Sequence, residues 1–191
     1  MPFLIGERVS LRPVEETDLE GPYAAWINSQ EADLLTEHAQ FPHSRRDLER
    51  YAESRNSSSN HLWLAIVESE SGRHVGNIEL SDIDWVHRKA KYAVIIGDRS
   101  ARGKGYGLEA SVLLLRHAFG KLNLNRVELG VHEQNLAARK LYDKLGFAEE
   151  GRQRQAFLRD GTFRDIVAMG LLAEDFYAQR LSEDVGSGNT E

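Results

Sequence analysis

Apolar residues alternate with polar ones, or form short β-branched runs, at several places along the chain, and both patterns are typical of strands. The predicted strands are residues 9–13, 61–67, 75–80, 91–96 and 126–132. Further along, Gln155–Leu158 and Thr162–Leu172 flank Asp160-Gly161, a dipeptide that favours tight hairpin turns. The pattern therefore predicts a series of strands that ends in a β-hairpin.

Apolar residues spaced three and four positions apart predict helices between these strands. The predicted helices begin at Thr17 or Asp18, after Ser44, at Gly107 and at Asn135. The last should end at Gly146, because glycine readily adopts the left-handed conformation that closes many helices. Trp26 falls on the apolar stripe of the first helix and is expected in the core.

The order of these elements predicts an α+β fold, in which a mainly antiparallel mixed sheet is flanked by helices in α/β/α layers. A chain of 191 residues suits one domain, which we expect to span residues 1–180. Residues 181–191 are polar and glycine-containing, and they predict a disordered tail.

The composition limits the class of protein. The chain has 24 Lys and Arg residues against 30 Asp and Glu residues, a formal net charge of −6, and no cysteine. The negative charge argues against a nucleic-acid partner, and the lack of cysteine excludes disulfides and thiolate metal ligands. No apolar run approaches the ~20 residues of a membrane span, and Met1–Ser10 lacks the features of a secretion signal. Together these two observations predict a cytoplasmic protein without a membrane partner. No His-Glu-x-x-His motif occurs, so we also expect no metal site.

The segment that leads from the predicted strand 91–96 into the next helix carries three alternating glycines, Gly103, Gly105 and Gly107. Glycine lets the backbone approach a ligand closely, and the first turn of a helix presents unpaired N–H groups with a partial positive charge. Together these features predict a cradle for a phosphate or a pyrophosphate.

Two other interpretations of this loop use known phosphate-binding patterns. The P-loop pattern fails because five residues, not four, separate Gly97 from Gly103-Lys104, and Gly105 stands where Ser or Thr should bind Mg²⁺. The dinucleotide pattern is nearly met by Gly105-x-Gly107-x-x-Ala110, so a nicotinamide-dependent oxidoreductase stays open as an alternative. A tight strand–helix connection that binds nothing is a third interpretation.

Two motifs together resemble the GNAT superfamily of N-acetyltransferases. Arg102–Gly107 is similar to the acyl-CoA loop of that family, R/Q-x-x-G-x-G/A, and Asn135–Phe147 is similar to its helix motif, N-x-x-A-x-x-x-Y-x-x-x-G-F. Residues 78–90 resemble spermidine and nucleotide-amino-sugar acetyltransferases, and residues 150–161 resemble enzymes that acetylate the N-termini of ribosomal proteins. The resemblance extends over roughly residues 9–176 and implies the GNAT fold.

The resemblance implies that acetyl-CoA is the co-substrate and that its acetyl group passes directly to an amine. The residues implied to bind acetyl-CoA lie on the strand end, the glycine loop and the helix motif: Val94, Ile95, Ile96, Arg102, Gly103, Lys104, Gly105, Tyr106, Gly107, Asn135, Ala138 and Tyr142. Tyr142 would donate a proton or a hydrogen bond to the leaving thiolate, unless it is only a core residue. Glu79 shares a strand face with Asn77 and would orient or deprotonate the amine, unless it is an ordinary exposed carboxylate.

The acceptor stays open, as either a small molecule or a peptide that carries a primary amine. A protein N-terminus, an amino sugar, a polyamine and an antibiotic all fit the resemblance. Lys91 stands where many of the polyamine-type relatives carry an acidic residue, which weakens the polyamine interpretation. A homodimer is a further expectation, since dimers are common in similar proteins. A non-catalytic acyl-CoA-binding module is the alternative to an enzyme.

Overall fold

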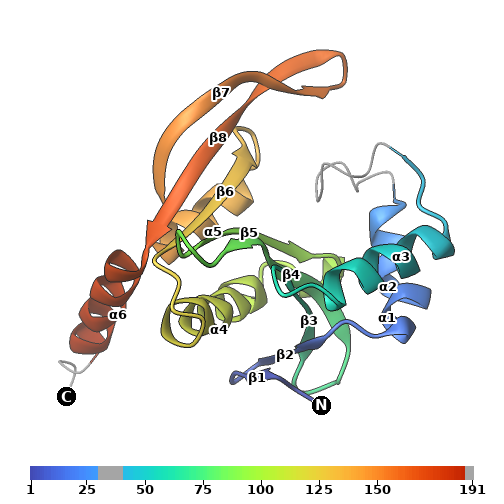
Figure 1. Ribbon diagram of the computed structural model, residues 1–191, viewed down its shortest axis with the longest axis horizontal. Coiled ribbons are helices and arrows are strands. Elements are labelled where there is room, and N and C mark those ends of the chain that lie inside the picture. Colours follow the sequence, from blue (N-terminus) through green and yellow to red (C-terminus); the bar gives the residue numbers. More distant parts are fainter. Residues whose placement is uncertain (30–40, 188–191) are drawn as a thin grey trace. The chain divides into compact units, whose positions relative to one another are not determined.

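The computed structural model describes residues 1–29 and 41–187, and the side chains of 1–29 and 41–181 (Figure 1). The chain forms two compact units, each made of two separate stretches of sequence. The first unit contains Met1–Ile83 and Tyr92–His117, and the second contains Asp84–Lys91 and Ala118–Glu191. No helix in the described ranges is long and apolar enough to cross a membrane.

The first unit is built on strands that follow the predicted order. Its strands are β1 (Leu4–Ile5), β2 (Val9–Pro13), β3 (Leu62–Glu68), β4 (His74–Asp84) and β5 (Lys89–Ile96), of which the first residues of β5 and Asp84 belong to the second unit. They are hydrogen-bonded neighbours in this order, and the pairs from β1 to β4 are antiparallel. β1 was not predicted from the sequence, because two residues are too few to show a period.

One extra residue in β4 changes which side chains share a face of the sheet. Ile66 on β3 is paired with Gly76, and the next residue, Val67, is paired with His74. Val75 is therefore an extra residue between the two pairs, which makes a β-bulge. Because directly opposite residues of antiparallel strands share a face, His74 lies on the same face as Val67.

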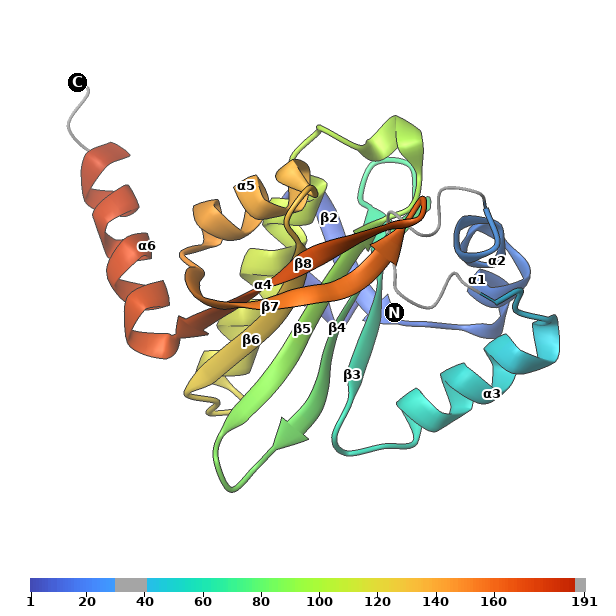
Figure 2. The same cartoon turned by 90° about the horizontal axis from the view of Figure 1, so that it is seen from above.

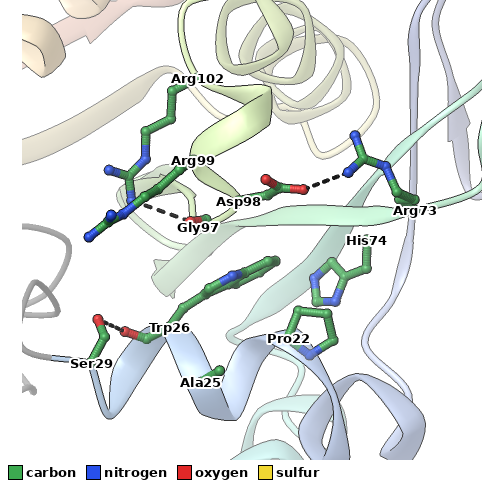
Figure 3. A pocket seen from close by; sticks show the side chains of 10 residues that line it. All are labelled: Pro22, Ala25, Trp26, Ser29, Arg73, His74, Gly97, Asp98, Arg99 and Arg102. Carbon is green, nitrogen blue, oxygen red and sulfur yellow. Dashed lines mark hydrogen bonds and ion pairs between the residues drawn. The ribbon is translucent and has the colours of Figure 1, made fainter.

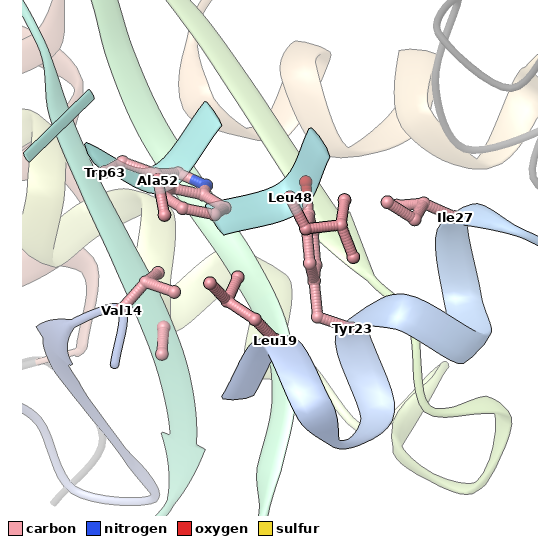
Figure 4. Packing of buried hydrophobic residues seen from close by; sticks show 8 residues of the cluster. Val14, Leu19, Tyr23, Ile27, Leu48, Ala52 and Trp63 are labelled. Carbon is pink, nitrogen blue, oxygen red and sulfur yellow. The ribbon is translucent and has the colours of Figure 1, made fainter. Parts of the chain in front are cut away.

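Helices cover both faces of these strands. The helices of the first unit are α1 (Glu16–Glu20), α2 (Pro22–Ile27), α3 (Arg45–Asn56), the 3₁₀ turn η3 (Arg99–Ala101) and most of α4 (Tyr106–Gly120). Helices α1 to α3 pack against the face of β3 that carries Trp63 and Ala65 (Figure 4). Glu68 belongs to the other face by alternation, and it accepts a hydrogen bond from Tyr106 of α4. The predicted α/β/α layering is confirmed in this unit.

The first predicted helix is two short helices in the structure. Glu15, and not Thr17 or Asp18, is the N-cap of α1, and Asp18 stands at N3, where its carboxylate accepts the Glu15 amide at 2.8 Å. Gly21 then separates α1 from α2, which begins at Pro22. Proline lacks an amide hydrogen and its ring clashes with the preceding turn, so it starts a helix rather than continuing one.

The buried apolar cluster under α1 to α3 holds these helices on the sheet. It consists of Val14, Leu19, Tyr23, Ile27, Leu48, Ala52, Trp63 and Ala65 (Figure 4). Trp26, which was expected in the core, is half-buried and packs against the edge of this cluster. The predicted start of α3 is confirmed, because the Ser44 side chain accepts the Asp47 amide at 3.3 Å.

The second unit contains a smaller set of strands. Its elements are β6 (Arg126–His132), α5 (Leu136–Leu145), β7 (Ala148–Arg159), β8 (Thr162–Leu172) and α6 (Ala173–Ser187) (Figure 2). β6 pairs in parallel with the first residues of β5 and antiparallel with β8, and β7 pairs antiparallel with β8. The predicted hairpin is confirmed, with Asp160 and Gly161 at positive φ angles of 48° and 72°.

Two elements of this unit extend beyond the prediction. β7 begins at Ala148 rather than Gln155, since its side chains are largely exposed and no buried face marks the strand in the sequence. α6 was not predicted, and it runs through Ser187, so it overlaps the expected tail of residues 181–191, of which 188–191 lie outside the described residues.

Candidate active site

The glycine loop between β5 and α4 presents a row of backbone amides. Gly103 and Gly105 have positive φ angles of 73° and 83°, whereas Lys104 between them does not. Such an alternation turns successive N–H groups toward one side and makes a concave nest for an anion. Within residues 1–29 and 41–187, the backbone amides of residues 103–107 donate no hydrogen bond. α4 begins at Tyr106 and adds the partial positive charge of its first turn.

The side chain of Arg102 is hydrogen-bonded to the backbone where the chain leaves β5 and enters the loop. Its Nε donates to the carbonyl oxygen of Ile96 at 3.0 Å, and its Nη2 donates to the carbonyl oxygen of Gly97 at 3.3 Å. The guanidinium therefore fixes the direction in which the backbone enters the loop.

Tyr106 anchors the other end of the loop at the start of α4. Its hydroxyl donates to Oε1 of Glu68 at 2.6 Å. Hydrogen bonds from Ser71, Tyr106 and Arg73 lower the pKa of Glu68 to about 2, and the ionised carboxylate in turn raises the pKa of Tyr106. Arg73 also pairs with Asp98, the N-cap of η3, at 3.0 Å. Both ends of the loop are thus tied to the β3–β4 region.

The end of β5 contains Val94, Ile95 and Ile96, which are all half-buried. The parallel register between β5 and β6 ends at the pair Lys91↔Glu128. The last residues of β5 lie beyond this pairing, so the strand changes its hydrogen-bonding pattern shortly before the glycine loop.

Glu79 lies on the sheet face that α1 to α3 cover. It is directly opposite Trp63, and Asn77 is opposite Ala65, so the predicted common face of Asn77 and Glu79 is confirmed. Glu79 is half-buried. Burial raises the pKa of Tyr51 on α3, and the negative charge of Glu79 raises it further. The carboxylate therefore faces the aromatic side chains of the covering helices.

A buried polar cluster on the same face was not singled out in the sequence. Nδ1 of His74 lies 3.2 Å from the carboxylate of Asp18, and Arg12 donates to both carboxylate oxygens at 2.6 and 2.8 Å. Nε2 of His74 lies 2.9 Å from the carbonyl oxygen of Gly76 and 3.2 Å from Oδ1 of Asn77. Burial alone would raise the pKa of Asp18, but the hydrogen bonds from Arg12 and His74 outweigh it and hold this pKa well below its usual range.

A cavity of about 610 Å³ lies between α2 and the residues that lead into the glycine loop (Figure 3). The indole of Trp26 forms one wall and lies against the backbone of Gly97. The lining residues are Pro22, Ala25, Trp26, Ser29, Arg73, His74, Gly97, Asp98, Arg99 and Arg102. The cavity thus joins the buried polar cluster to the start of the loop.

Tyr142 and Asn135 belong to α5 in the second unit. Tyr142 is buried, and burial raises the pKa of its hydroxyl to about 12. Asn135 is the N-cap of α5, and its Oδ1 accepts the amide of Ala138 at 3.1 Å. Gly146 ends the helix with a φ of 93°, as predicted. The spacing between Asn135 and Gly146 in the motif therefore corresponds to the length of α5, which the two residues cap at its ends.

The predicted site residues are divided between the two units. The strand end, the glycine loop and Glu79 belong to the first unit, and Asn135, Ala138 and Tyr142 belong to the second. The buried polar cluster has only a weak signal in the sequence, because Asp18 and His74 lie 56 positions apart and each follows another polar residue.

A strand that runs through a glycine nest into a helix, in an α+β fold, is an arrangement that suits a phosphate-containing ligand. The family model described as an acetyltransferase (GNAT) domain matches residues 8–148. Spermidine N(1)-acetyltransferase of Escherichia coli strain K12 is 29% identical over 188 residues, which cover 90% of this chain and 89% of that protein. The putative ribosomal N-acetyltransferase YdaF of Bacillus subtilis is 32% identical over 109 residues, which cover 57% of this chain and 59% of that protein.

Solved structures agree with these relatives. The spermidine N-acetyltransferase of Vibrio cholerae, in complex with CoA and spermine, superposes with a TM-score of 0.81 at 25% identity, over 90% of this chain and 99% of that chain. A dodecameric structure of the V. cholerae enzyme has a TM-score of 0.75 at 25% identity, over 90% of this chain and 97% of that chain.

The chain belongs to the GNAT family of acetyltransferases. It is an acetyl-CoA-dependent acyltransferase with the GNAT fold, so the predicted family, fold and co-substrate are confirmed. This assignment replaces the nicotinamide interpretation of the glycine loop.

Proposed function

We propose that this protein transfers the acetyl group of acetyl-CoA directly to a primary amine, and that a polyamine is its acceptor. The observation that carries the proposal is the glycine nest at residues 103–107, whose amides donate no hydrogen bond within the described chain. Acetyl-CoA supplies an acetyl group that is already activated as a thioester. The protein has to hold this co-substrate, stabilise the thiolate that leaves and keep the amine in its neutral form.

The glycine loop holds the diphosphate of acetyl-CoA. The amides of Gly103, Lys104, Gly105, Tyr106 and Gly107 donate to the phosphate oxygens, and the first turn of α4 adds its partial positive charge. The side chains of Arg102 and Lys104 add full positive charges to the same region. The end of β5, at Val94, Ile95 and Ile96, hydrogen-bonds the pantetheine arm, and one of its N–H groups polarises the thioester carbonyl. Asn135 and Ala138 support this binding from the start of α5.

Tyr142 donates a hydrogen bond to the thiolate as it leaves. Its pKa of about 12 lies ~3.5 units above the ~8.5 of a thiol, so complete proton transfer would cost roughly 5 kcal/mol. A hydrogen bond to the developing thiolate avoids that cost. This favours the hydrogen-bond role over full protonation, and Tyr142 stays protonated throughout the physiological pH range.

Glu79 orients the amine and receives its proton, directly or through water. An alkylammonium has a pKa of ~10 and cannot attack a thioester until it loses a proton. A half-buried carboxylate beside aromatic rings attracts an ammonium group, because both the charge and the ring faces favour a cation. These surroundings support a functional carboxylate rather than an ordinary exposed one.

The relatives support a polyamine as the acceptor. The E. coli relative, aligned over 90% of this chain, is a spermidine acetyltransferase, and the V. cholerae structure contains spermine. Lys91 argues against a polyamine, because many of the polyamine-type relatives carry an acidic residue at this position. A ribosomal protein N-terminus is the second candidate, favoured by the 32% identity to YdaF. We further propose a homo-oligomer, which the dodecameric V. cholerae structure supports, and a cytoplasmic location.

An acetyl-transfer assay with a panel of amines tests the proposal. The panel should contain spermidine, spermine, an amino sugar, an aminoglycoside and a peptide with a free N-terminus, each corrected for thioester hydrolysis without acceptor. We expect the highest kcat/KM with a polyamine. Turnover confined to the peptide would show that the acceptor is a protein N-terminus and not a polyamine. Saturable CoA binding without turnover on any amine would indicate a binding module instead of an enzyme.

A further inference from the structure

Arg8 lies outside both sequence motifs, in the turn between β1 and β2, yet its side chain contacts the glycine loop. Its Nη1 donates to the carbonyl oxygen of Lys104 at 2.8 Å, although the two residues are 96 positions apart. Its Nε donates to Oε2 of Glu109, in the first turn of α4, at 2.9 Å. The guanidinium carbon also lies 5.9 Å from the centre of the Tyr106 ring. Arg8 therefore connects the loop to the start of the helix.

Glu109 fixes both the backbone and the side chain of Arg8. Its Oε1 accepts the backbone amides of Arg8 at 2.8 Å and of Val9 at 3.3 Å. Burial tends to raise the pKa of Glu109, whose side chain is 16% exposed, but the hydrogen bonds from Arg8 and Val9 lower it overall. The carboxylate is thus ionised, and it holds the guanidinium in one position.

The hydrogen bond from Arg8 sets the direction of the next amide group in the loop. In a planar trans peptide, the C=O and the N–H of one peptide unit point to opposite sides. Because the Lys104 carbonyl points at Arg8, the N–H of Gly105 in the same peptide unit points away from Arg8. Gly105 has a φ of 83° and belongs to the nest, so its N–H direction is part of the anion-binding geometry.

We propose that Arg8 is a positioning residue for acetyl-CoA, which orients the Gly105 amide through the Lys104 carbonyl and neutralises the carboxylate of Glu109 beside the nest. The role rests on the proposed binding of the diphosphate at the loop. Without Arg8, the Lys104–Gly105 peptide can rotate, and the negative charge of Glu109 repels the diphosphate. The loop sequence alone therefore does not complete the site.

Calorimetry with CoA and kinetics with two acyl donors test this role. We expect Arg8→Gln to weaken CoA binding and raise the KM for acetyl-CoA by about 10- to 100-fold, the range for losing hydrogen bonds that involve a charged group. The kcat should stay within about threefold of wild type. Acetyl-pantetheine carries the same thioester without the diphosphate, so its kcat/KM should be unchanged by Arg8→Gln.

Two further variants separate the parts of the role. Arg8→Lys keeps the charge near Glu109 but cannot hold Glu109 and the Lys104 carbonyl with one planar fork, so its loss should be intermediate. The double variant Arg8→Gln with Glu109→Gln should regain part of the CoA affinity, because the repelling charge is gone. No regain would overturn the charge part of the proposal.

Arg45→Ala is the matched control, since Arg45 is an arginine that pairs with Glu20 and Glu49 on exposed surface of the same unit. It should bind CoA like wild type. Wild-type CoA affinity in Arg8→Gln, or equal losses with both acyl donors, would contradict the role of Arg8. Failure of the wild-type protein to bind CoA would contradict the proposed function itself. If Arg8→Gln does not fold, Arg8→Lys is used instead to compare acetyl-CoA with acetyl-pantetheine.

Discussion

The indole of Trp26 lies directly on the backbone of Gly97, so that a β-carbon at residue 97 would occupy the same space as the ring (Figure 3). This contact joins α2 to the residues that precede the glycine loop. It explains why a residue expected in the core forms a wall of the cavity: the Trp26 side chain packs against the apolar cluster, and its ring also covers Gly97.

Gly97→Ala should therefore lower the stability of the protein. Overpacking of this kind costs about 1–3 kcal/mol, because either the indole or the backbone has to move. Urea unfolding measures the loss. Gly151→Ala is the control, since a β-carbon there meets open space, and it should be close to neutral. Equal stability of the two variants would show that Trp26 moves away from Gly97 without cost.

Gly105→Val should weaken acetyl-CoA binding more than it weakens the fold. A branched side chain is strained at a φ of 83° and blocks the approach of the backbone to the ligand. Gly161→Val creates a similar strain at a φ of 72° in the tip of the β7–β8 hairpin. Calorimetry with CoA should separate the two, with a loss of affinity only in Gly105→Val. Tight CoA binding by Gly105→Val would count against the nest.

Tyr142→Phe should lower turnover by about 10²- to 10⁴-fold with little change in acetyl-CoA affinity. The reason is that the hydrogen bond to the thiolate forms only as the C–S bond breaks. Single-turnover kinetics at saturating acetyl-CoA measure the effect. Tyr177→Phe changes a partly exposed tyrosine of α6 in the same unit and should leave turnover unchanged. Full turnover in Tyr142→Phe would remove this residue from the mechanism.

Asp18→Asn should be strongly destabilising at neutral pH and less so in acid. Asp18 has a lowered pKa in the folded protein, so its ionised form contributes stability above the unfolded pKa of ~3.9 and loses that contribution as pH falls toward the folded pKa. Breaking a buried ion pair costs about 3–5 kcal/mol, because Arg12 is left without its partner.

Urea unfolding at pH 7 and pH 3 measures this dependence. The difference between wild type and Asp18→Asn should be largest at pH 7 and should shrink at pH 3. Glu16→Gln, an exposed change in the same helix, should give nearly the same small difference at both values. A loss in Asp18→Asn that does not change with pH would mean that the carboxylate acts by shape rather than by charge.

Local patterns in the sequence predicted the parts of the site that depend on neighbours in the chain. Asn135 and Gly146 mark the two ends of α5, because an N-cap and a left-handed glycine act within one turn of the helix. Ser44 marks the start of α3 for the same reason. The glycine loop was predicted as an anion cradle because glycines let the backbone approach a ligand and a helix start has unpaired N–H groups. The positive φ angles of Gly103 and Gly105 are conformations that glycine adopts readily.

Contacts between distant parts of the chain were not predictable in this way. Arg8 reaches Lys104 across 96 positions, and nothing in the turn around Arg8 indicates a partner in the loop. The contacts of Asp18 with Arg12 and His74 likewise join residues of different elements. Such features depend on tertiary structure, which periodicity does not describe. The break of the first helix at Gly21 and Pro22 is a different case, because a local signal was present and the continuous apolar stripe masked it.

The β-bulge at Val75 also affects how relatives of this protein should be compared. Upstream of the bulge, even-numbered His74 shares a side of the sheet with odd-numbered Asn77 and Glu79, so simple odd–even counting assigns the wrong side to any residue before position 75. A homologue that lacks the inserted residue keeps the residue before it opposite the equivalent of Val67, on the face that α1 covers. A comparison with this chain therefore has to place its gap at position 75, because a gap placed after it would pair His74 with a residue that lies on the opposite face of the sheet.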